Sequence, residues 1–241
     1  AGALVIVRVS DLTQATSAPG ILLADTWHHI EFRCHINNSG IADVYVDGVL
    51  AIDGGTADYY VNVPGGMTIM LLGGSYSSTI SPGNIYDDLV IRTDDTGLPA
   101  LLGEHRIHSL LPSADTAQAD WTGTYADIDD PLGAVNDGDT SYISTSTLNN
   151  KSEFAVADLP VSPTTIHAVQ TTVVAKKTDT GTKGVTAYVK SGATRGDGAE
   201  FGAANGAYRI KMDIHELNPD GAVAWTETTV NSMLVGVEIT T

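Results

Sequence analysis

Short stretches of alternating apolar and polar residues recur along this chain, and a period of two is typical of half-buried β-strands. In residues 27–33 the alternation puts His28, Ile30 and Phe32 on one face of a predicted strand. Cys34 continues that face, and we expect it to lie in the core beside Phe32 as a small apolar side chain. The pattern favours an antiparallel sheet in this part of the chain.

The strongest turn signal is Asp47-Gly48, which stands in the middle of residues 43–52 between two runs rich in β-branched side chains. Asp and Gly can both adopt positive φ, which the two central residues of a type I′ turn require. The pattern therefore predicts a β-hairpin over residues 43–52. We expect the Asp-Gly-Gly sequence at 53–55 to end it.

Further strands are indicated by alternation, or by apolar runs bounded by Gly, Pro and Asn turns. In the first half they are predicted at residues 4–9, 59–63, 67–72 and 85–92. In the second half they are predicted at residues 101–110, 142–145, 153–159, 165–177, 185–190, 208–217 and 237–239. We expect the strand at 185–190 to return antiparallel to the strand at 165–177. Irregular structure is predicted for residues 112–139 and 191–207.

One helix is predicted, over residues 225–234. Thr226 can cap its first turn, and Gly236 follows its last turn. Val230, Met233 and Leu234 are spaced to share one apolar stripe.

Strands that recur every ~8–12 residues with turns between them indicate β-sandwiches. We therefore predict an all-β protein with two antiparallel, jelly-roll-like β-sandwich domains at 1–98 and 99–241, and one short C-terminal helix. The seam falls in residues 94–103, which include an Asp-Asp-Thr-Gly run. The chain begins inside an apolar run, which leaves open whether the first domain has further residues upstream.

The chain is acidic, with 12 basic and 29 acidic residues and a net charge of −17. This balance argues against a protein that works by neutralising phosphates, so we expect no nucleic-acid partner. It favours solubility and a neutral, basic or cation-bridged partner. No apolar run approaches the ~20 residues of a membrane-spanning helix, so no membrane insertion is expected. The single cysteine excludes an internal disulfide.

Candidate chemistry is sparse. Asp87 and Asp88 could supply oxygens to a Ca²⁺ ion, although no complete calcium loop is present. Apart from that ion no cofactor is expected. The glutamates are scattered and no Gly-x-Ser-x-Gly motif occurs, so we expect no enzyme activity. Residues 195–197 spell Arg-Gly-Asp, an integrin-binding tripeptide, which we attribute to chance in a glycine-rich stretch.

Residues from about 4 to 92 resemble the concanavalin-A-like, laminin-G-type sandwich. The matching segments are residues 27–32, 44–48 and 85–91. The resemblance implies a β-sandwich, for which carbohydrate binding through rim loops is a common role.

The second half is similar to the C-terminal part of tailed-bacteriophage virion proteins. The resembling segments are residues 120–122, 137–143, 168–170, 190–192, 218–226 and 235–237. The similarity implies a component of the virion surface, in capsid decoration, tail or fibre, and it supplies no catalytic residues.

We therefore expect a virion structural protein that forms a homo-oligomer and contacts other virion proteins. Host-surface glycan binding is left open, with Tyr76 and Tyr125 as contact residues and Asp87 or Asp88 if a cation bridges. Two alternatives remain: a purely structural assembly module without ligand, and a glycan-cleaving enzyme, which would need two facing carboxyl groups.

Overall fold

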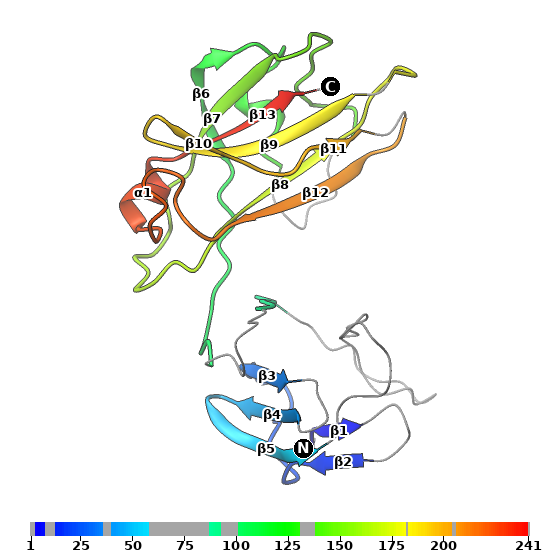
Figure 1. Ribbon diagram of the computed structural model, residues 1–241, viewed down its shortest axis with the longest axis vertical. Coiled ribbons are helices and arrows are strands. Elements are labelled where there is room, and N and C mark those ends of the chain that lie inside the picture. The colour runs from blue at the N-terminus through cyan, green and yellow to red at the C-terminus, as the bar shows by residue number, and fades with distance from the viewer. Residues whose placement is uncertain are drawn as a thin grey trace. The chain divides into compact units, whose positions relative to one another are not determined.

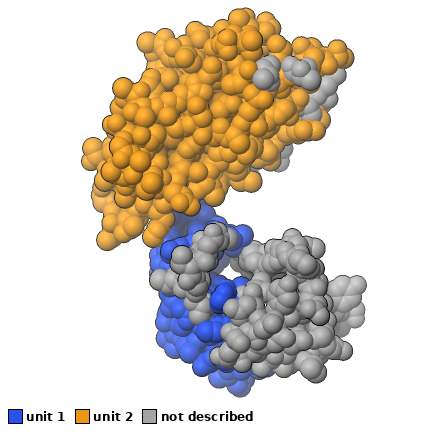
Figure 2. Space-filling model, viewed as in Figure 1, with its two compact units in different colours: residues 1–107 blue, residues 108–241 orange. Residues whose placement is uncertain are grey.

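The computed structural model describes residues 3–7, 13–35, 40–57, 87–92, 101–130, 138–181, 183–203 and 206–240. The chain divides into two compact units, Ala1–Ile107 and His108–Thr241, which Figure 2 colours separately. We expected a boundary between residues 98 and 99, whereas the contacts group residues 99–107 with the first unit.

In the described part of both units, regular structure consists of antiparallel β-sheets apart from one α-helix and one 3-10 turn. The prediction of an all-β protein with a single short helix near the C-terminus is confirmed. The packing of these sheets into two jelly-roll sandwiches stays a prediction.

The first unit contains a small strand pair and a three-stranded sheet (Figure 1). Its strands are β1 (Val5–Val7), β2 (Thr13–Thr16), β3 (Ile30–His35), β4 (Gly40–Val46) and β5 (Val49–Ala57). β1 pairs with β2, and the order β3-β4-β5 places β4 in the centre of the larger sheet. The apolar side chains Ala42, Val44 and Val46 of β4 are buried together with Ile52 of β5.

The predicted hairpin is confirmed, since β4 and β5 pair antiparallel around Asp47 and Gly48. Both residues have positive φ, 51° and 78°, as a type I′ turn requires. The Asp47 carboxylate also accepts hydrogen bonds from the His29 backbone N–H and from Nδ1 of His28, at 2.9 and 2.8 Å. The bond with His28, and then that with His29, holds the pKa of Asp47 below its ordinary value. Both bonds connect the turn to the residues before β3.

β5 does not end at the Asp-Gly-Gly sequence, as predicted, but continues to Ala57. The pairing register shifts here, and Gly55 has a φ of 60°. The Asp53 carboxylate accepts the Gly55 N–H at 2.9 Å. A glycine with positive φ and a register shift are the features of a β-bulge, which lets a strand absorb extra residues without stopping.

β3 is less buried than expected, and its burial alternates in the opposite sense to the prediction, since Ile30 is exposed and Glu31 is half-buried. Phe32 stands opposite Val44 of β4, so the two side chains share a face. Phe32 is nevertheless 51 % exposed, because β3 is an edge strand among the described strands of this sheet. The expectation that Phe32 is a core residue is therefore wrong. Cys34 is half-buried, and burial raises the pKa of its thiol. The strand begins at Ile30, and the side chain of Trp27 is exposed.

Two segments predicted as strands, 87–92 and 101–110, are irregular. Asp88 has a φ of 51°, which is incompatible with an extended strand, and its carboxylate accepts the Ile107 N–H at 2.7 Å. A side chain rather than a neighbouring strand therefore satisfies this backbone donor. The strands predicted at 59–63 and 67–72, and residues 85 and 86 of the last one, lie outside the described residues.

The second unit contains a six-stranded sheet and a separate two-stranded ribbon (Figure 1). The sheet follows the order β10-β9-β13-β7-β6, and β11 also pairs with β9. Its strands are β6 (Pro112–Ala119), β7 (Lys151–Val156), β9 (Gly184–Ser191), β10 (Thr194–Asp197), β11 (Phe201–Gly202) and β13 (Leu234–Ile239). The ribbon consists of β8 (Val169–Ala175) and β12 (Arg209–His215), and we call it the β8–β12 ribbon.

Strand positions in the second unit were predicted better than strand partners. The strands expected at 153–159, 165–177, 185–190, 208–217 and 237–239 are confirmed as β7, β8, β9, β12 and β13. The expected pairing of β9 with β8 is wrong, because β9 pairs with β13, β10 and β11. β8 instead pairs along its whole length with β12. The unbroken burial of residues 184–189 fits the central position of β9.

Other segments differ from the prediction. β6, β10 and β11 lie in stretches expected to be irregular. Gly192, with a φ of 56°, permits the tight turn that joins β9 to β10. Residues 142–145 form no strand, only a single bridge from Ser144 to Thr122.

Helix α1 (Glu227–Asn231) is shorter than predicted, but its cap is confirmed. The Thr226 hydroxyl accepts the Thr229 N–H at 3.2 Å, which satisfies an N–H that has no partner inside the helix. Val230 and Met233 are buried against Val156, Val189 and Trp225, which form the main apolar core of this unit.

Gly236 does not follow the helix, as expected, but lies within β13 opposite Tyr188 of β9. The Tyr188 side chain is fully buried. A Cβ atom at position 236 would overlap the Tyr188 ring, so only glycine leaves room for it. This contact fixes the two central strands of the sheet against each other.

We predict that Gly236→Ala lowers the free energy of unfolding of the second unit by about 2–3 kcal/mol, because the added methyl forces the Tyr188 ring to shift. Urea unfolding followed by tryptophan fluorescence, to which the buried Trp225 contributes, measures the loss. Gly202→Ala in β11 is the control, since a Cβ there meets nothing within 4 Å. An equal loss in both variants would contradict the role assigned to Gly236.

Candidate functional site

The site residues predicted from the sequence do not form one cluster. Tyr76 lies outside the described residues. Tyr125 belongs to the second unit and Asp87 and Asp88 to the first. Tyr125 starts the 3-10 turn η1 (Tyr125–Asp127), where its N–H donates to the Asp115 carboxylate at 2.7 Å. Its half-buried side chain therefore lies on a short, anchored turn.

Asp87 and Asp88 already have hydrogen-bond partners. Asp87 accepts the Asp88 N–H at 2.9 Å, and Asp88 pairs with Arg106 at 3.3 Å in addition to accepting the Ile107 N–H. No group of three metal-ligating side chains occurs within the described residues. A Ca²⁺ ion at this position, which would have to displace Arg106, stays a prediction.

The Arg-Gly-Asp tripeptide lies in β10, where it is not presented as a free loop. Arg195 pairs with both Asp197 and Glu238 and stacks 3.7 Å from the centre of the Tyr188 ring. Its guanidinium is thus held against the sheet by three neighbours. This arrangement accounts for Arg195 by its packing and gives no support to integrin binding.

A partly buried ion pair lies on the same sheet. The Lys190 ammonium contacts both oxygens of Glu153, at 2.8 and 3.1 Å, and the Tyr188 hydroxyl donates to Glu153 at 3.3 Å. Burial raises the pKa of Tyr188, and the negative charge of Glu153 raises it further. The phenol therefore stays neutral and serves as a hydrogen-bond donor.

We predict that Lys190→Met destabilises the second unit by about 2 kcal/mol, because it leaves the Glu153 carboxylate buried without a counter-ion. The cost stays below that of a fully buried pair, since Lys190 is 29 % exposed. The double variant Lys190→Met with Glu153→Gln should recover most of the lost free energy of unfolding, as measured by urea unfolding. Lys151→Met, at a half-buried lysine without an ion pair among the described residues, is the control.

β12 places Lys211, Asp213 and His215 on the face that turns toward the segment after β10. Lys211 pairs with Asp213 at 2.8 Å, and Asp213 accepts the Ala199 N–H at 3.1 Å. Burial lowers the pKa of His215, although the charges of Asp213 and Asp197 act in the opposite direction. Nε2 of His215 is buried and has no hydrogen-bond partner, so a charge on this ring would be poorly solvated.

The lowered pKa predicts how stability changes with pH. Around and below the ordinary pKa of about 6.5 the unfolded chain binds a proton at this histidine more readily than the folded chain does, so stability falls as the pH decreases. His215→Gln should flatten this dependence between about pH 7.5 and 5.5 in urea unfolding. His108→Gln, at an exposed histidine, should leave it unchanged. Parallel pH profiles for wild type and His215→Gln would contradict the assignment.

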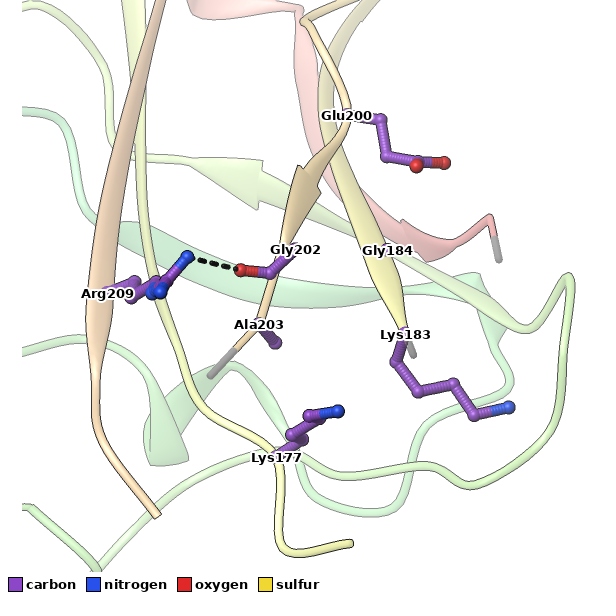
Figure 3. Close-up of a pocket in the computed structure, with 7 residues that line it drawn as sticks. All are labelled: Lys177, Lys183, Gly184, Glu200, Gly202, Ala203 and Arg209. Atoms are coloured by element: carbon purple, nitrogen blue, oxygen red, sulfur yellow. Dashed lines mark hydrogen bonds between the residues drawn. The ribbon is translucent and has the colours of Figure 1, made fainter. Parts of the chain in front are cut away.

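A pocket of about 310 Å³ lies where several strands of the second unit begin or end (Figure 3). It is lined by Lys177, Lys183, Gly184, Glu200, Gly202, Ala203 and Arg209. Lys177 follows β8, Lys183 precedes β9, and Arg209 opens β12. We call it the basic pocket, because three of its side chains are cationic.

Backbone contacts hold the wall of the basic pocket in place. The Ala203 N–H donates to the Lys183 carbonyl at 3.1 Å, and the Gly206 N–H donates to the Lys177 carbonyl at 2.9 Å. Nη1 of Arg209 donates to the Gly202 carbonyl at 3.4 Å (Figure 3). Hydrogen bonds therefore connect the segments that carry Lys177, Lys183 and Arg209 to β11 or to the residues that follow it.

Most other described basic side chains of this unit are neutralised. Lys176 pairs with Asp139, Lys190 with Glu153, Lys211 with Asp213, and Arg195 with Asp197 and Glu238. By contrast, Lys177, Lys183 and Arg209 form no ion pair with a described carboxylate. The basic pocket thus brings three cations together with one carboxylate, that of Glu200, in an otherwise acidic chain.

The outer face of the β8–β12 ribbon has the opposite character. Ile210, Met212 and Ile214 alternate along β12 and are 65 %, 57 % and 64 % exposed. They stand opposite Val174, Thr172 and Gln170 of β8, all exposed. These six residues carry no charge, and we call them the apolar ribbon face.

Comparison of the chain with protein-family models, with curated proteins and with solved structures found no match. Within the described residues, no helix has the length and hydrophobicity needed to span a membrane.

Neither the basic pocket nor the apolar ribbon face was singled out from the sequence. A signal for the pocket was present, because Lys176, Lys177 and Lys183 lie close together in a chain with few basic residues. The alternation of Ile210, Met212 and Ile214 was also visible. Alternation alone does not say whether such a face is covered.

Proposed function

We propose that this chain is a structural component of a bacteriophage virion, displayed on the particle surface and joined to neighbouring copies through the apolar ribbon face. The proposal is supported by the segments of the second half that resemble tailed-phage virion proteins, and the β-rich architecture is compatible with it. The observation that carries it is the uncharged, exposed face formed by Ile210, Met212 and Ile214.

Charge explains why this face suits contact between copies. Each chain has a net charge of −17, so two copies repel each other over most orientations. The apolar ribbon face brings no like charges together and removes exposed apolar surface from water on contact. Neither ribbon strand pairs with a further described strand, so each also offers an edge for β-pairing.

The size of the ribbon predicts a weak contact. Seven residues at a rise of about 3.3 Å make a ribbon about 23 Å long and two strands wide. The area of such a face is far below the roughly 800 Å² that each partner buries in a standard interface. A single contact would then be transient in solution. Many such contacts on a particle would be stable together, because each binding event raises the effective concentration for the next.

We predict that Ile210→Lys combined with Ile214→Lys abolishes self-association, which sedimentation velocity at increasing protein concentration detects. Leu148→Lys is the matched control, because Leu148 is 49 % exposed outside the ribbon. Circular dichroism checks that each variant keeps its strands. Association that persists in the double variant, or is lost equally in the control, would contradict the assignment of the ribbon.

The virion role has a separate test. Mass spectrometry of purified phage particles should detect the chain in a fixed ratio to the major capsid protein, and antibody labelling should place it on the particle exterior. Its absence from purified particles would refute the virion role, whatever the outcome for the ribbon.

A further inference from the structure

We propose that the basic pocket binds the acidic group of a small polar ligand, specifically a sugar unit that carries a carboxylate. This inference does not depend on the assembly role. Arg209 and Ile210 are neighbours on β12 and therefore point to opposite faces of the ribbon. The pocket and the apolar ribbon face can thus be tested separately.

The charge of the pocket selects an anion. Lys177, Lys183 and Arg209 line one space and have no described carboxylate in ion-pair contact. Placing three cations together with only the Glu200 carboxylate costs electrostatic energy unless a further anion joins them. In a chain with 29 acidic residues, a pairing carboxylate was available at most other described lysines of this unit.

Lys176 and Lys177 show the contrast directly. Lys176 pairs with Asp139 and lies 4.7 Å from the centre of the Tyr208 ring, so its charge is used within the fold. Lys177, the next residue, lines the pocket instead. Two adjacent lysines thus serve different purposes, and the first provides a control for the second.

Arg209 provides the geometry for an oxyanion. A guanidinium has five N–H donors, and one nitrogen of Arg209 is held by the Gly202 carbonyl at 3.4 Å. This bond orients the group and leaves other donors for a ligand. A guanidinium matches the two oxygens of a carboxylate, while the ammonium groups of Lys177 and Lys183 add charge at less defined angles.

The remaining lining favours a sugar acid over a bare anion. At about 310 Å³ the pocket is at the lower end of ligand pockets, which suits one ring-sized unit. Glu200 adds a carboxylate that can accept hydrogen bonds from ligand hydroxyls, whereas it would repel a phosphate or another compact anion. The lining contains no aromatic ring, so stacking would contribute nothing and a neutral sugar would have little to bind.

The test is titration of the full-length protein with sodium glucuronate, glucose and inorganic phosphate, followed by NMR chemical-shift changes. We expect glucuronate to shift the amides around residues 183 and 202, phosphate to bind more weakly, and glucose to cause no saturable change. Arg209→Gln and Lys183→Gln should each weaken glucuronate binding roughly tenfold, as expected for a lost charge-assisted hydrogen bond. Lys176→Gln should leave it within about twofold, because Lys176 already pairs with Asp139.

A gain of binding gives an independent check that misfolding cannot imitate. Glu200→Gln removes the carboxylate of the pocket and should strengthen inorganic phosphate binding severalfold. Equal binding of glucose and glucuronate would overturn the proposal, as would phosphate binding without glucuronate binding. Failure of all three probes to cause saturable shifts would overturn it as well.

Discussion

The second unit depends on one contact, in which the Tyr188 ring lies over the backbone of Gly236 at the centre of the sheet. The ring fills the space that a side chain on β13 would take. Its hydroxyl reaches the Glu153 carboxylate on β7, and Arg195 of β10 stacks on the ring. One residue thereby links four adjacent strands. Because the ring is fully buried, these polar partners have defined positions and Tyr188 stays neutral.

That contact also explains how an acidic chain keeps charged groups inside a sheet. Glu153 is buried, yet it has Lys190 beside it and the Tyr188 hydroxyl as a second donor. Glu238 is satisfied by Arg195 in the same way. Positive side chains are scarce, and half of those in the second unit, Lys176, Lys190, Arg195 and Lys211, are used for such local compensation. The three cations of the basic pocket belong to the other half.

The sequence predicted those features that depend on neighbouring residues. The turn at Asp47-Gly48 and the cap at Thr226 were both foreseen, because a positive φ or an unpaired helical N–H places demands on one or two residues. Strand positions such as that of β12 followed from alternation. The pairing partner of each strand did not follow from alternation. β8 and β12 are paired across more than thirty residues of intervening chain, and no local sequence feature specifies that choice. The role of Gly236 was missed for the same reason, since the tyrosine that requires it lies on another strand. The basic pocket likewise joins residues that only the strand partners bring together.

β12 illustrates how tightly a short strand can be specified. Its odd-numbered positions, Arg209 to His215, contact the interior of the unit and the basic pocket, and its even-numbered positions form the apolar ribbon face. Evolution can therefore change the residues of each face independently, one substitution at a time. The length of the strand has no such freedom. Loss or gain of one residue would exchange the two faces, so that aliphatic side chains met the pocket and ionised ones took their place on the apolar ribbon face.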